Sequence, residues 1–290
     1  MTARQTHKCP TEPVPQPPGY PTPGGGSVDR VLIGVLDSGV GGISVLNEIR
    51  TLLPAVDVLF VADSAYAPYG PRTPEWIQQR TELLSRFLLD EGAKAIVVAC
   101  NTATAAAAQT LRETFDVPIV AMEPAVKPAA AATRNGVVGV LATVGTLKSA
   151  RFAALLDRFG SEITVVTEPG VGLVEQVEAG ELDGPRTRDL VKAAVTPLLD
   201  QGADVIVLGC THYPFLRPVI QQIAGPEVVL IDTGAAVANR LADVLAAAGL
   251  ESANPAHGSA EFWTSGEPGE AMRVISALYG ASVDVEPLAL

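Results

Sequence analysis

The sequence predicts an α/β fold built from two similar halves with mainly parallel sheets, and three observations support this fold class. The chain has 290 residues, of which 48% are hydrophobic, so it can form one large domain or two of ordinary size. From Arg30 onward, short apolar runs alternate with Ala- and Leu-rich stretches of helical length. A segment of the first half also recurs 110 residues further along. Regular alternation favours parallel sheets, and the recurrence favours a duplicated unit.

The apolar runs are continuous rather than alternating, which is typical of strands buried on both faces. Helical sequences fill the intervals, most clearly 75–90 and 186–200. The strands that we expect are 31–36, 58–61, 95–99, 117–121, 137–141, 163–166, 205–208 and 228–231.

The recurring segment covers 88–100 and 198–210, without a gap and with eight of thirteen positions identical. Both copies end on a cysteine, Cys100 and Cys210, directly after a predicted strand. In parallel sheets, ligands bind beyond the carboxyl ends of the strands. Polar residues follow each cysteine: Asn101 and Thr102 in the first copy, Thr211 and His212 in the second. We therefore expect both thiols at a functional site.

The two cysteines also have simpler interpretations. A buried cysteine often packs as a small apolar residue. A zinc site or a redox pair would require further cysteine or histidine residues at close spacing, such as CxxC, and neither pattern is present. We therefore expect no metal site, and the equivalent positions of Cys100 and Cys210 favour catalysis over packing.

The net charge and the composition of the N-terminal segment indicate which partners the protein binds and where in the cell it is expected. The net charge of −12 opposes binding to phosphate backbones, so we expect no nucleic-acid partner. No run of eighteen apolar residues is present, so we expect no membrane span. Residues 1–29 hold seven prolines and four glycines, a composition that predicts a disordered tail rather than a signal peptide. The cytoplasm is therefore the expected location.

A glycine-rich segment, 35–42, follows the first predicted strand. Its glycines let the backbone approach a ligand closely, and a helix beginning near Ile43 would direct amide groups at an anion. Nucleotide-binding spacings are absent, so we expect this anion to be a substrate carboxylate. Asp37, at a buried strand end, requires a partner such as a thiol or an ammonium group. Ser38, and Thr143 at the corresponding place in the second half, are candidate carboxylate donors.

Four segments resemble, in order and approximate spacing, the signature segments of glutamate racemases in the aspartate/glutamate racemase family: 37–42, 68–70, 100–103 and 209–214. The resemblance extends from about Val31 to the C-terminus. It implies two pseudo-symmetric α/β domains that face each other across the active site, the second inserted into the first. The implied boundaries are 30–124 plus 234–290 for the first domain and 125–233 for the second.

The resemblance also implies a mechanism. Cys100 and Cys210 would act on opposite faces of the α-carbon of glutamate, one as thiolate base and the other as thiol acid, without a cofactor. A thiol suits both roles once its surroundings adjust its pKa. Asp37 would hold the substrate ammonium group or assist Cys100, and His212 would assist Cys210. The implied substrate-binding residues are Asp37, Ser38, Pro68, Tyr69, Gly70, Asn101, Thr102, Thr143, Thr211 and His212, with Asp63 and Glu175 as supporting acids.

Other functions remain open at this stage. One is racemisation of aspartate or another acidic amino acid, although His212 resembles the glutamate enzymes more closely. Another is a non-catalytic amino-acid-binding protein on the same fold, and a third is a hydrolase or lyase with a cysteine nucleophile. The resemblance further implies a homodimer that supplies D-glutamate for the peptidoglycan of the bacterial cell wall.

Overall fold

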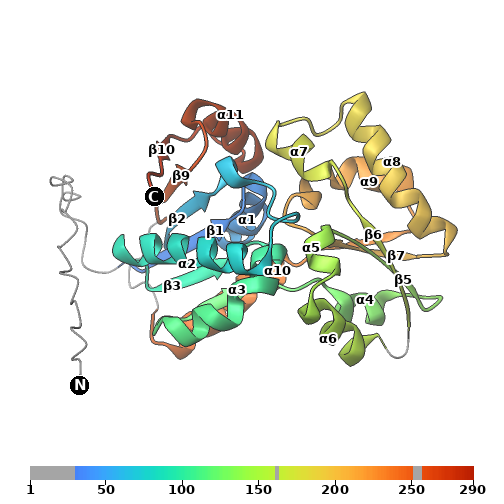
Figure 1. Cartoon of the computed structure of the whole chain (residues 1–290), viewed down its shortest axis with the longest axis horizontal. Coiled ribbons are helices and arrows are strands. Elements are labelled where there is room, and N and C mark those ends of the chain that lie inside the picture. Colours follow the sequence, from blue (N-terminus) through green and yellow to red (C-terminus); the bar gives the residue numbers. More distant parts are fainter. Residues whose placement is uncertain (1–29, 161–162, 251–256) are drawn as a thin grey trace, which may run out of the picture.

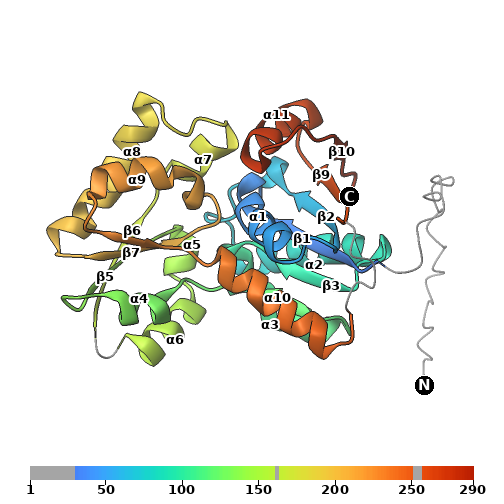
Figure 2. The same cartoon turned by 180° about the vertical axis from the view of Figure 1, so that it is seen from behind.

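The computed structural model describes residues 30–160, 163–250 and 257–290, and the tail expected at 1–29 lies outside these ranges. The described chain forms two β-sheets, and helices cover both faces of each sheet (Figures 1 and 2). All paired strands in both sheets are parallel. The predicted α/β class with two mainly parallel sheets is therefore confirmed.

The first sheet has six strands in the order β10-β9-β2-β1-β3-β4. These strands are β1 (Leu32–Asp37), β2 (Asp57–Ala62), β3 (Ala95–Val98), β4 (Ile119–Ala121), β9 (Ala260–Thr264) and β10 (Val285–Pro287). Side chains alternate between the two faces of a strand, so each face receives its own helices. Helices α2 (Pro74–Asp90) and α3 (Asn101–Thr114) cover one face, while α1 (Ile43–Leu52), α10 (Gly234–Ala247) and α11 (Pro268–Tyr279) cover the other.

The second sheet has four strands in the order β6-β5-β7-β8. These strands are β5 (Val137–Ala142), β6 (Thr164–Pro169), β7 (Val205–Gly209) and β8 (Val229–Ile231). One face packs against α4 (Val126–Ala132) and α6 (Ala150–Phe159), and the other against α8 (Pro185–Asp200) and α9 (Arg217–Ala224). The short helices α5 (Val144–Leu147) and α7 (Leu173–Glu178) follow β5 and β6.

The two sheets repeat one arrangement. Strands β2-β1-β3-β4 of the first sheet correspond in order and direction to β6-β5-β7-β8 of the second. The strands that precede the two cysteines, β3 and β7, therefore occupy matching positions. This agrees with the recurrence in the sequence.

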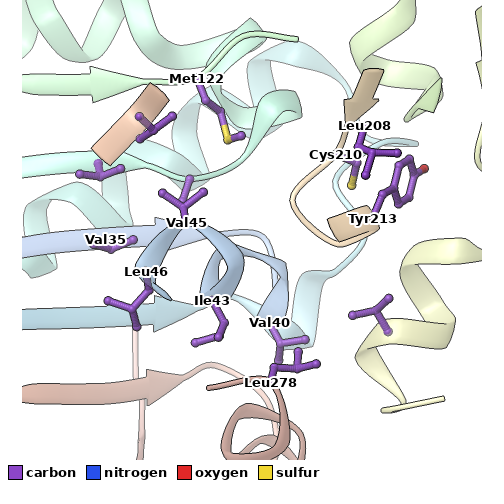
Figure 3. Close-up of a cluster of buried hydrophobic side chains, with 14 of the residues drawn as sticks. Val35, Val40, Ile43, Val45, Leu46, Met122, Leu208, Cys210, Tyr213 and Leu278 are labelled. Carbon is purple, nitrogen blue, oxygen red and sulfur yellow. The ribbon is translucent and has the colours of Figure 1, made fainter. Parts of the chain in front are cut away.

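The two halves share one large hydrophobic cluster. Figure 3 shows part of it, in which Ile43 and Val45 of α1 belong to the same buried cluster as Leu208 of β7 and Tyr213. Tyr213 lies in the 3-10 helix η3 (Tyr213–Leu216) and is fully buried. Burial of apolar surface between the halves stabilises the packing of one half against the other.

The expected strands appear in the structure with ends displaced by at most three residues. Strands β9 and β10 are absent from the predicted set. β9 alternates buried and partly exposed residues and contains Glu261, and the last two residues of β10 are exposed. These two strands therefore lack the continuous apolar run by which the others were predicted. No helix in the described ranges is long and apolar enough to cross a membrane.

Candidate active site

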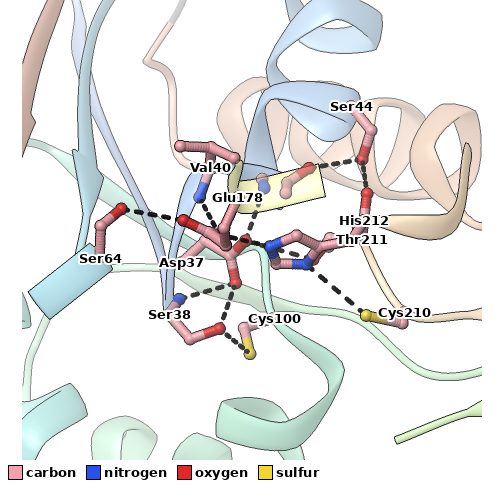
Figure 4. Close-up of polar contacts among 12 residues, drawn as sticks. Asp37, Ser38, Val40, Ser44, Ser64, Cys100, Glu178, Cys210, Thr211 and His212 are labelled. Atoms are coloured by element: carbon pink, nitrogen blue, oxygen red, sulfur yellow. Dashed lines mark hydrogen bonds and ion pairs between the residues drawn. The ribbon is translucent and has the colours of Figure 1, made fainter. Parts of the chain in front are cut away.

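A small cavity of about 10 Å³ lies where segments that follow β1, β3, β5 and β7 come together. Both predicted catalytic thiols reach it, one from each half of the molecule (Figure 4). Its lining residues are Ser38, Pro68, Tyr69, Gly70, Cys100, Asn101, Thr102, Thr143, Val174, Cys210, Thr211 and His212. The predicted catalytic and substrate-binding residues all line it except Asp37, and Val174 of α7 is an addition that sequence reasoning missed.

Cys100 caps the N-terminus of α3. Its Sγ accepts a hydrogen bond from the amide of Ala103 at 3.4 Å and lies 3.5 Å from Oγ of Ser38. Burial raises the pKa of the Cys100 thiol, and the nearby charge of Asp37 raises it further, whereas the hydrogen bonds with Ser38 and Ala103 lower it. The raised pKa keeps Cys100 a thiol at neutral pH in the closed cavity.

Cys210 lies at the end of β7, beside the imidazole of His212. Its Sγ is 3.7 Å from Nδ1 of His212, and Nε2 of the same ring is 2.6 Å from Oε1 of Glu178. A carboxylate fixes a proton on the ring nitrogen that faces it, so Nδ1 remains the atom that exchanges a proton with the thiol. The geometry thus places a proton acceptor or donor next to Cys210.

His212 is buried among groups that favour its charged form. Burial lowers the pKa of His212, but the hydrogen bonds with Cys210 and Glu178 outweigh burial, and the pKa lies well above its usual value. The protonated imidazole places a positive charge beside Cys210. The second half therefore surrounds its thiol with the opposite electrostatic environment from the one that surrounds Cys100.

Asp37 lies at the end of β1, behind the cavity and fully buried. Its carboxylate accepts hydrogen bonds from the amides of Ser38 and Gly42 at 2.7 and 2.6 Å, and from the Thr211 hydroxyl at 3.2 Å. Burial raises its pKa, although His212 lowers it. The Ser38 hydroxyl also donates to Asp37 and accepts from Cys100. Hydrogen bonds thus connect Asp37 to both halves of the site.

The glycine-rich loop after β1 differs from our expectation in one respect. We expected its amides to bind a substrate carboxylate, but they bind carboxylates of the protein. Asp37 occupies the amides of Ser38 and Gly42, and Glu178 occupies the amide of Val40 at 2.7 Å. The difference has two causes: Asp37 binds amides of its own loop, and Glu178 of the other half reaches the amide of Val40.

Glu178 is the second residue that sequence reasoning missed. It ends α7 three residues after Glu175, which the family resemblance singled out. Residues three apart lie near each other on a helix, so a pair of acids at this spacing was the available signal. In the structure Glu178 bonds to His212, whereas Glu175 is exposed and lines an adjoining hollow of about 220 Å³, which shares Pro68, Gly70, Thr143 and Val174 with the cavity.

Asp63 supports the cavity wall from behind. Its carboxylate is fully buried and accepts hydrogen bonds from Nε and Nη2 of Arg80 at 2.8 and 2.7 Å. It also accepts a hydrogen bond from the Tyr69 hydroxyl. Tyr69 lines the cavity and Asp63 does not. Asp63 thus acts on the site by holding the loop that contains Tyr69.

Polar groups at the start of α3 face the second half. The Thr102 hydroxyl lies 2.8 Å from that of Thr143, and Thr143 donates to Thr146 at 3.0 Å. Asn101 is buried, and neither Nδ2 nor Oδ1 of its side chain has a hydrogen-bond partner among the described residues. An unsatisfied buried amide is costly, so these atoms on the cavity wall are available for a polar ligand. No group of three or more His, Cys, Asp or Glu side chains in the described ranges is arranged to hold a metal ion.

Comparisons with known proteins agree with this geometry. The family model described as Asp/Glu/Hydantoin racemase matches residues 33–241. A glutamate racemase of Pseudomonas aeruginosa is 56% identical over 263 residues, covering 90% of this chain and 99% of the relative.

Two solved structures are similar over most of the chain. Glutamate racemase isoform RacE1 from Bacillus anthracis is 32% identical with a TM-score of 0.83, and covers 90% of this chain and 98% of its own. Glutamate racemase of Escherichia coli, in complex with L-glutamate and the activator UDP-MurNAc-Ala, is 34% identical with a TM-score of 0.79 and the same coverage. Since the family model matches well over half of the sequence, the chain belongs to the Asp/Glu/hydantoin racemase family.

Proposed function

We propose that this protein interconverts L- and D-glutamate without a cofactor, using Cys100 and Cys210 as the two proton-transfer groups. The observation that carries the proposal is the placement of the two thiols. They follow matching strands of two repeated sheets and line one cavity from opposite halves. A racemase must remove the α-proton from one face and return a proton to the other, and this arrangement supplies a group for each face.

In the proposed reaction, one cysteine as thiolate takes the α-proton of glutamate, and the pair of electrons stays on the α-carbon and its carboxylate. The other cysteine, as thiol, then donates its proton to the opposite face. Each turnover exchanges the protonation states of the two cysteines. A second turnover in the same direction therefore begins only after both cysteines have returned to their starting protonation states. Ser38 and Asp37 assist the change at Cys100, and His212 assists the change at Cys210.

General acid–base catalysis supplies roughly 10²- to 10⁴-fold acceleration, which is too little for the weakly acidic α-proton of an amino acid. The site must also stabilise the carbanion with fixed donors in a dry pocket. We assign this task to Asn101, whose side-chain amide lines the cavity and has no hydrogen-bond partner within the described ranges, and to the hydroxyls of Thr102, Thr143 and Thr211.

The cavity between the thiols has a volume of about 10 Å³, close to that of one water site. Glutamate is larger than this volume, so we propose that the two halves separate to admit it and close again for the reaction. Closure would exclude water, which strengthens the electrostatic interactions within the site. The proposed halves are residues 30–124 plus 234–290, and 125–233.

Glutamate is favoured over aspartate, over another acidic amino acid and over a non-catalytic binding role. A relative at 56% identity is named a glutamate racemase, and the similar E. coli enzyme binds L-glutamate.

We further propose that the protein acts as a cytoplasmic homodimer and supplies D-glutamate for peptidoglycan. Growth of a bacterium that requires added D-glutamate, restored by this chain, would test the last point.

The first test is proton NMR of the purified protein with L-glutamate in D₂O, together with circular dichroism of the amino acid. We expect the α-proton signal to disappear while optical activity decays to zero. Aspartate and other amino acids, run in the same way, are the controls for substrate class. Folded protein that leaves glutamate unchanged, or that racemises aspartate faster, would contradict the proposal.

A further inference from the structure

The chain returns from the second half to the first between β8 and α10, and Figure 2 shows this crossing. Asp232 lies in the connecting segment, and its carboxylate contacts both halves. Its Oδ1 accepts a hydrogen bond from the amide of Gly234, the first residue of α10, at 3.0 Å. Its Oδ2 forms an ion pair with Nη2 of Arg217, the first residue of α9. One carboxylate therefore bridges the halves at the point where the chain crosses between them.

The Arg217 guanidinium holds the connecting segment at two points. Its Nη1 donates a hydrogen bond to the carbonyl of Leu230 in β8 at 3.0 Å, while Nη2 reaches the carboxylate of Asp232. Because the guanidinium is planar and rigid, two contacts define the orientation of the groups that it joins. Asp232 is therefore fixed to β8 and α9, and should move with the second half.

The start of α10 belongs to the first half. Thr233, the residue before this helix, makes no side-chain hydrogen bond to it, so Asp232 supplies an acceptor for one of its first amides. Gly234 is buried, and a Cβ atom there would lie 3.0 Å from Cγ of Glu48 in α1. This close packing means that Gly234 should move with α1.

The same part of α1 contacts the loop that follows Cys210. The Ser44 hydroxyl donates a hydrogen bond to the carbonyl of Thr211 at 2.8 Å. A Cβ atom on Gly234 would lie 3.6 Å from the carbonyl oxygen of Ser44. The bridge at Asp232 thus lies close to the place where the Cys210 loop joins the first half.

We propose that Arg217 and Asp232 form a clamp that stabilises the close packing of the two halves and limits how often they separate. On separation Gly234 moves with the first half and Arg217 with the second, so Asp232 cannot keep both contacts in their present geometry. Loss of either contact opposes the motion. This inference rests on the separation of the halves proposed above, but not on the identity of the substrate.

The test is the rate at which iodoacetamide alkylates Cys100 and Cys210 at one pH without glutamate, measured by mass spectrometry of the two peptides. The thiols are 5% and 6% exposed, and the cavity between them is about 10 Å³, so the reagent should reach them when the halves separate. We expect Arg217→Gln to speed alkylation of both thiols by about two- to fivefold, the effect of losing one partly exposed ion pair.

The two thiols together distinguish separation of the halves from a local effect. Arg217 lies a short way after Cys210 in the sequence, so local loosening of the second half would speed alkylation of Cys210 alone. Cys100 follows β3 in the first half, and its rate should respond only when the halves separate. Acceleration of both thiols by the same factor is therefore the result that supports the clamp.

Arg188→Gln is the matched control. Arg188 forms an ion pair with Asp183 at 2.6 Å and donates a hydrogen bond to Gln222 at 2.7 Å, and all three residues belong to the second half. Its loss should leave both alkylation rates unchanged.

Two further measurements address the charge of the clamp. Asp232→Asn keeps an oxygen for the amide of Gly234 but loses the negative charge, so it should also speed alkylation of both thiols. The side chains of Arg217 and Asp232 are 37% and 27% exposed, so salt can screen their attraction. Sodium chloride at about 1 M, where the screening length is only about 3 Å, should therefore speed alkylation more in the wild-type protein than in Arg217→Gln.

Unchanged rates in folded Arg217→Gln, acceleration of Cys210 alone, or equal acceleration in Arg188→Gln would overturn the clamp. If Arg217→Gln does not fold, as judged from its thermal transition, Asp232→Asn decides in the same way. Wild-type thiols that react only as fast as the whole protein unfolds would overturn both the separation of the halves and the clamp. Failure to racemise glutamate would contradict the proposed function and would leave the outcome of the alkylation test as it stands.

Discussion

At the scale of single residues, the two thiols differ in their surroundings although they follow equivalent strands. Cys100 lies near Asp37, whose negative charge raises the pKa of its thiol, while Cys210 lies beside a positively charged imidazole. A negative group therefore lies near one thiol of the cavity and a positive group near the other.

Each cysteine should be indispensable for inversion. We expect Cys100→Ala and Cys210→Ala to reduce glutamate racemisation by about 10²- to 10⁴-fold or more, because each removes one of the two proton-transfer groups. Circular dichroism measures the inversion, and NMR in D₂O measures exchange of the α-proton. The remaining thiol still acts on one face, so exchange of one enantiomer should decline less than inversion. Wild-type inversion in either variant would rule out the two-thiol mechanism.

The raised pKa of Cys100 gives a second prediction at this scale. In the folded, ligand-free protein we expect iodoacetamide to alkylate Cys100 very slowly at pH 7, with a rate that still rises above pH 9. In urea the same peptide should titrate near the ordinary thiol value of about 8.5. Because the folded pKa is the higher one, the stability that this thiol contributes is present below the unfolded pKa and is lost as pH rises toward the folded pKa. Identical profiles with and without urea would contradict the assignment.

At the scale of elements, continuous apolar runs predicted the central strands because those strands are buried on both faces. Strands β9 and β10 escaped prediction because they contain exposed residues that interrupt the apolar pattern; β10 is the edge strand, and β9 lies between it and β2. The recurrence in the sequence predicted that β3 and β7 would be equivalent, since each is followed by a cysteine. Glu178 could not be predicted in the same way. Its contacts with His212 and Val40 cross 34 and 138 residues of sequence, and depend on how the halves face each other.

The contact between α2 and the loop after β2 is a further feature that the sequence did not indicate. Asp63 follows β2, and Arg80 of α2 reaches its carboxylate with two nitrogens. The same carboxylate accepts a hydrogen bond from the Tyr69 hydroxyl. The ion pair of Asp63 and Arg80 therefore holds the cavity wall that contains Tyr69 against α2. Both charged side chains are largely buried, at 0% and 10% exposure.

Removing one partner of this buried pair should destabilise the fold. We expect Asp63→Asn to lower the free energy of unfolding by about 3–5 kcal/mol, because Arg80 is left buried without a counter-charge. Tyr69→Phe removes one hydrogen bond and should cost about 1 kcal/mol. Urea denaturation of both variants measures the difference. A cost for Asp63→Asn no greater than that for Tyr69→Phe would show that the ion pair does not anchor the loop.

At the scale of the whole molecule, the site belongs to neither half alone. Cys100 and Ser38 follow strands of the first sheet, while Cys210 and His212 follow a strand of the second. The cavity between them is too small for an amino acid. Each turnover should therefore include separation and closure of the halves, and the hydroxyls of Thr102 and Thr143 are among the groups that must part.

A cross-link between the halves tests this motion. A Cβ atom on Gly70 would lie 3.4 Å from Cβ of Thr143, close to the separation of about 3.5–4.5 Å that a disulfide requires. The double variant Gly70→Cys/Thr143→Cys should thus form a disulfide across the mouth of the cavity under mild oxidation. We expect racemisation by the oxidised protein to fall to the background rate and to return when dithiothreitol reduces the bond, as followed by circular dichroism.

The oxidised and reduced forms of the double variant carry the same substitutions. A difference in activity between them therefore reports the effect of the disulfide and not the loss of the original side chains. The two single variants, treated with the same oxidant, measure inactivation by oxidation of Cys100 or Cys210, and peptide mass spectrometry identifies the bond formed. Because closure by a covalent bond leaves the thiols in place, loss of activity that dithiothreitol reverses means that glutamate enters only when the halves separate. Full activity with the disulfide formed would mean that substrate reaches the thiols while the halves remain together.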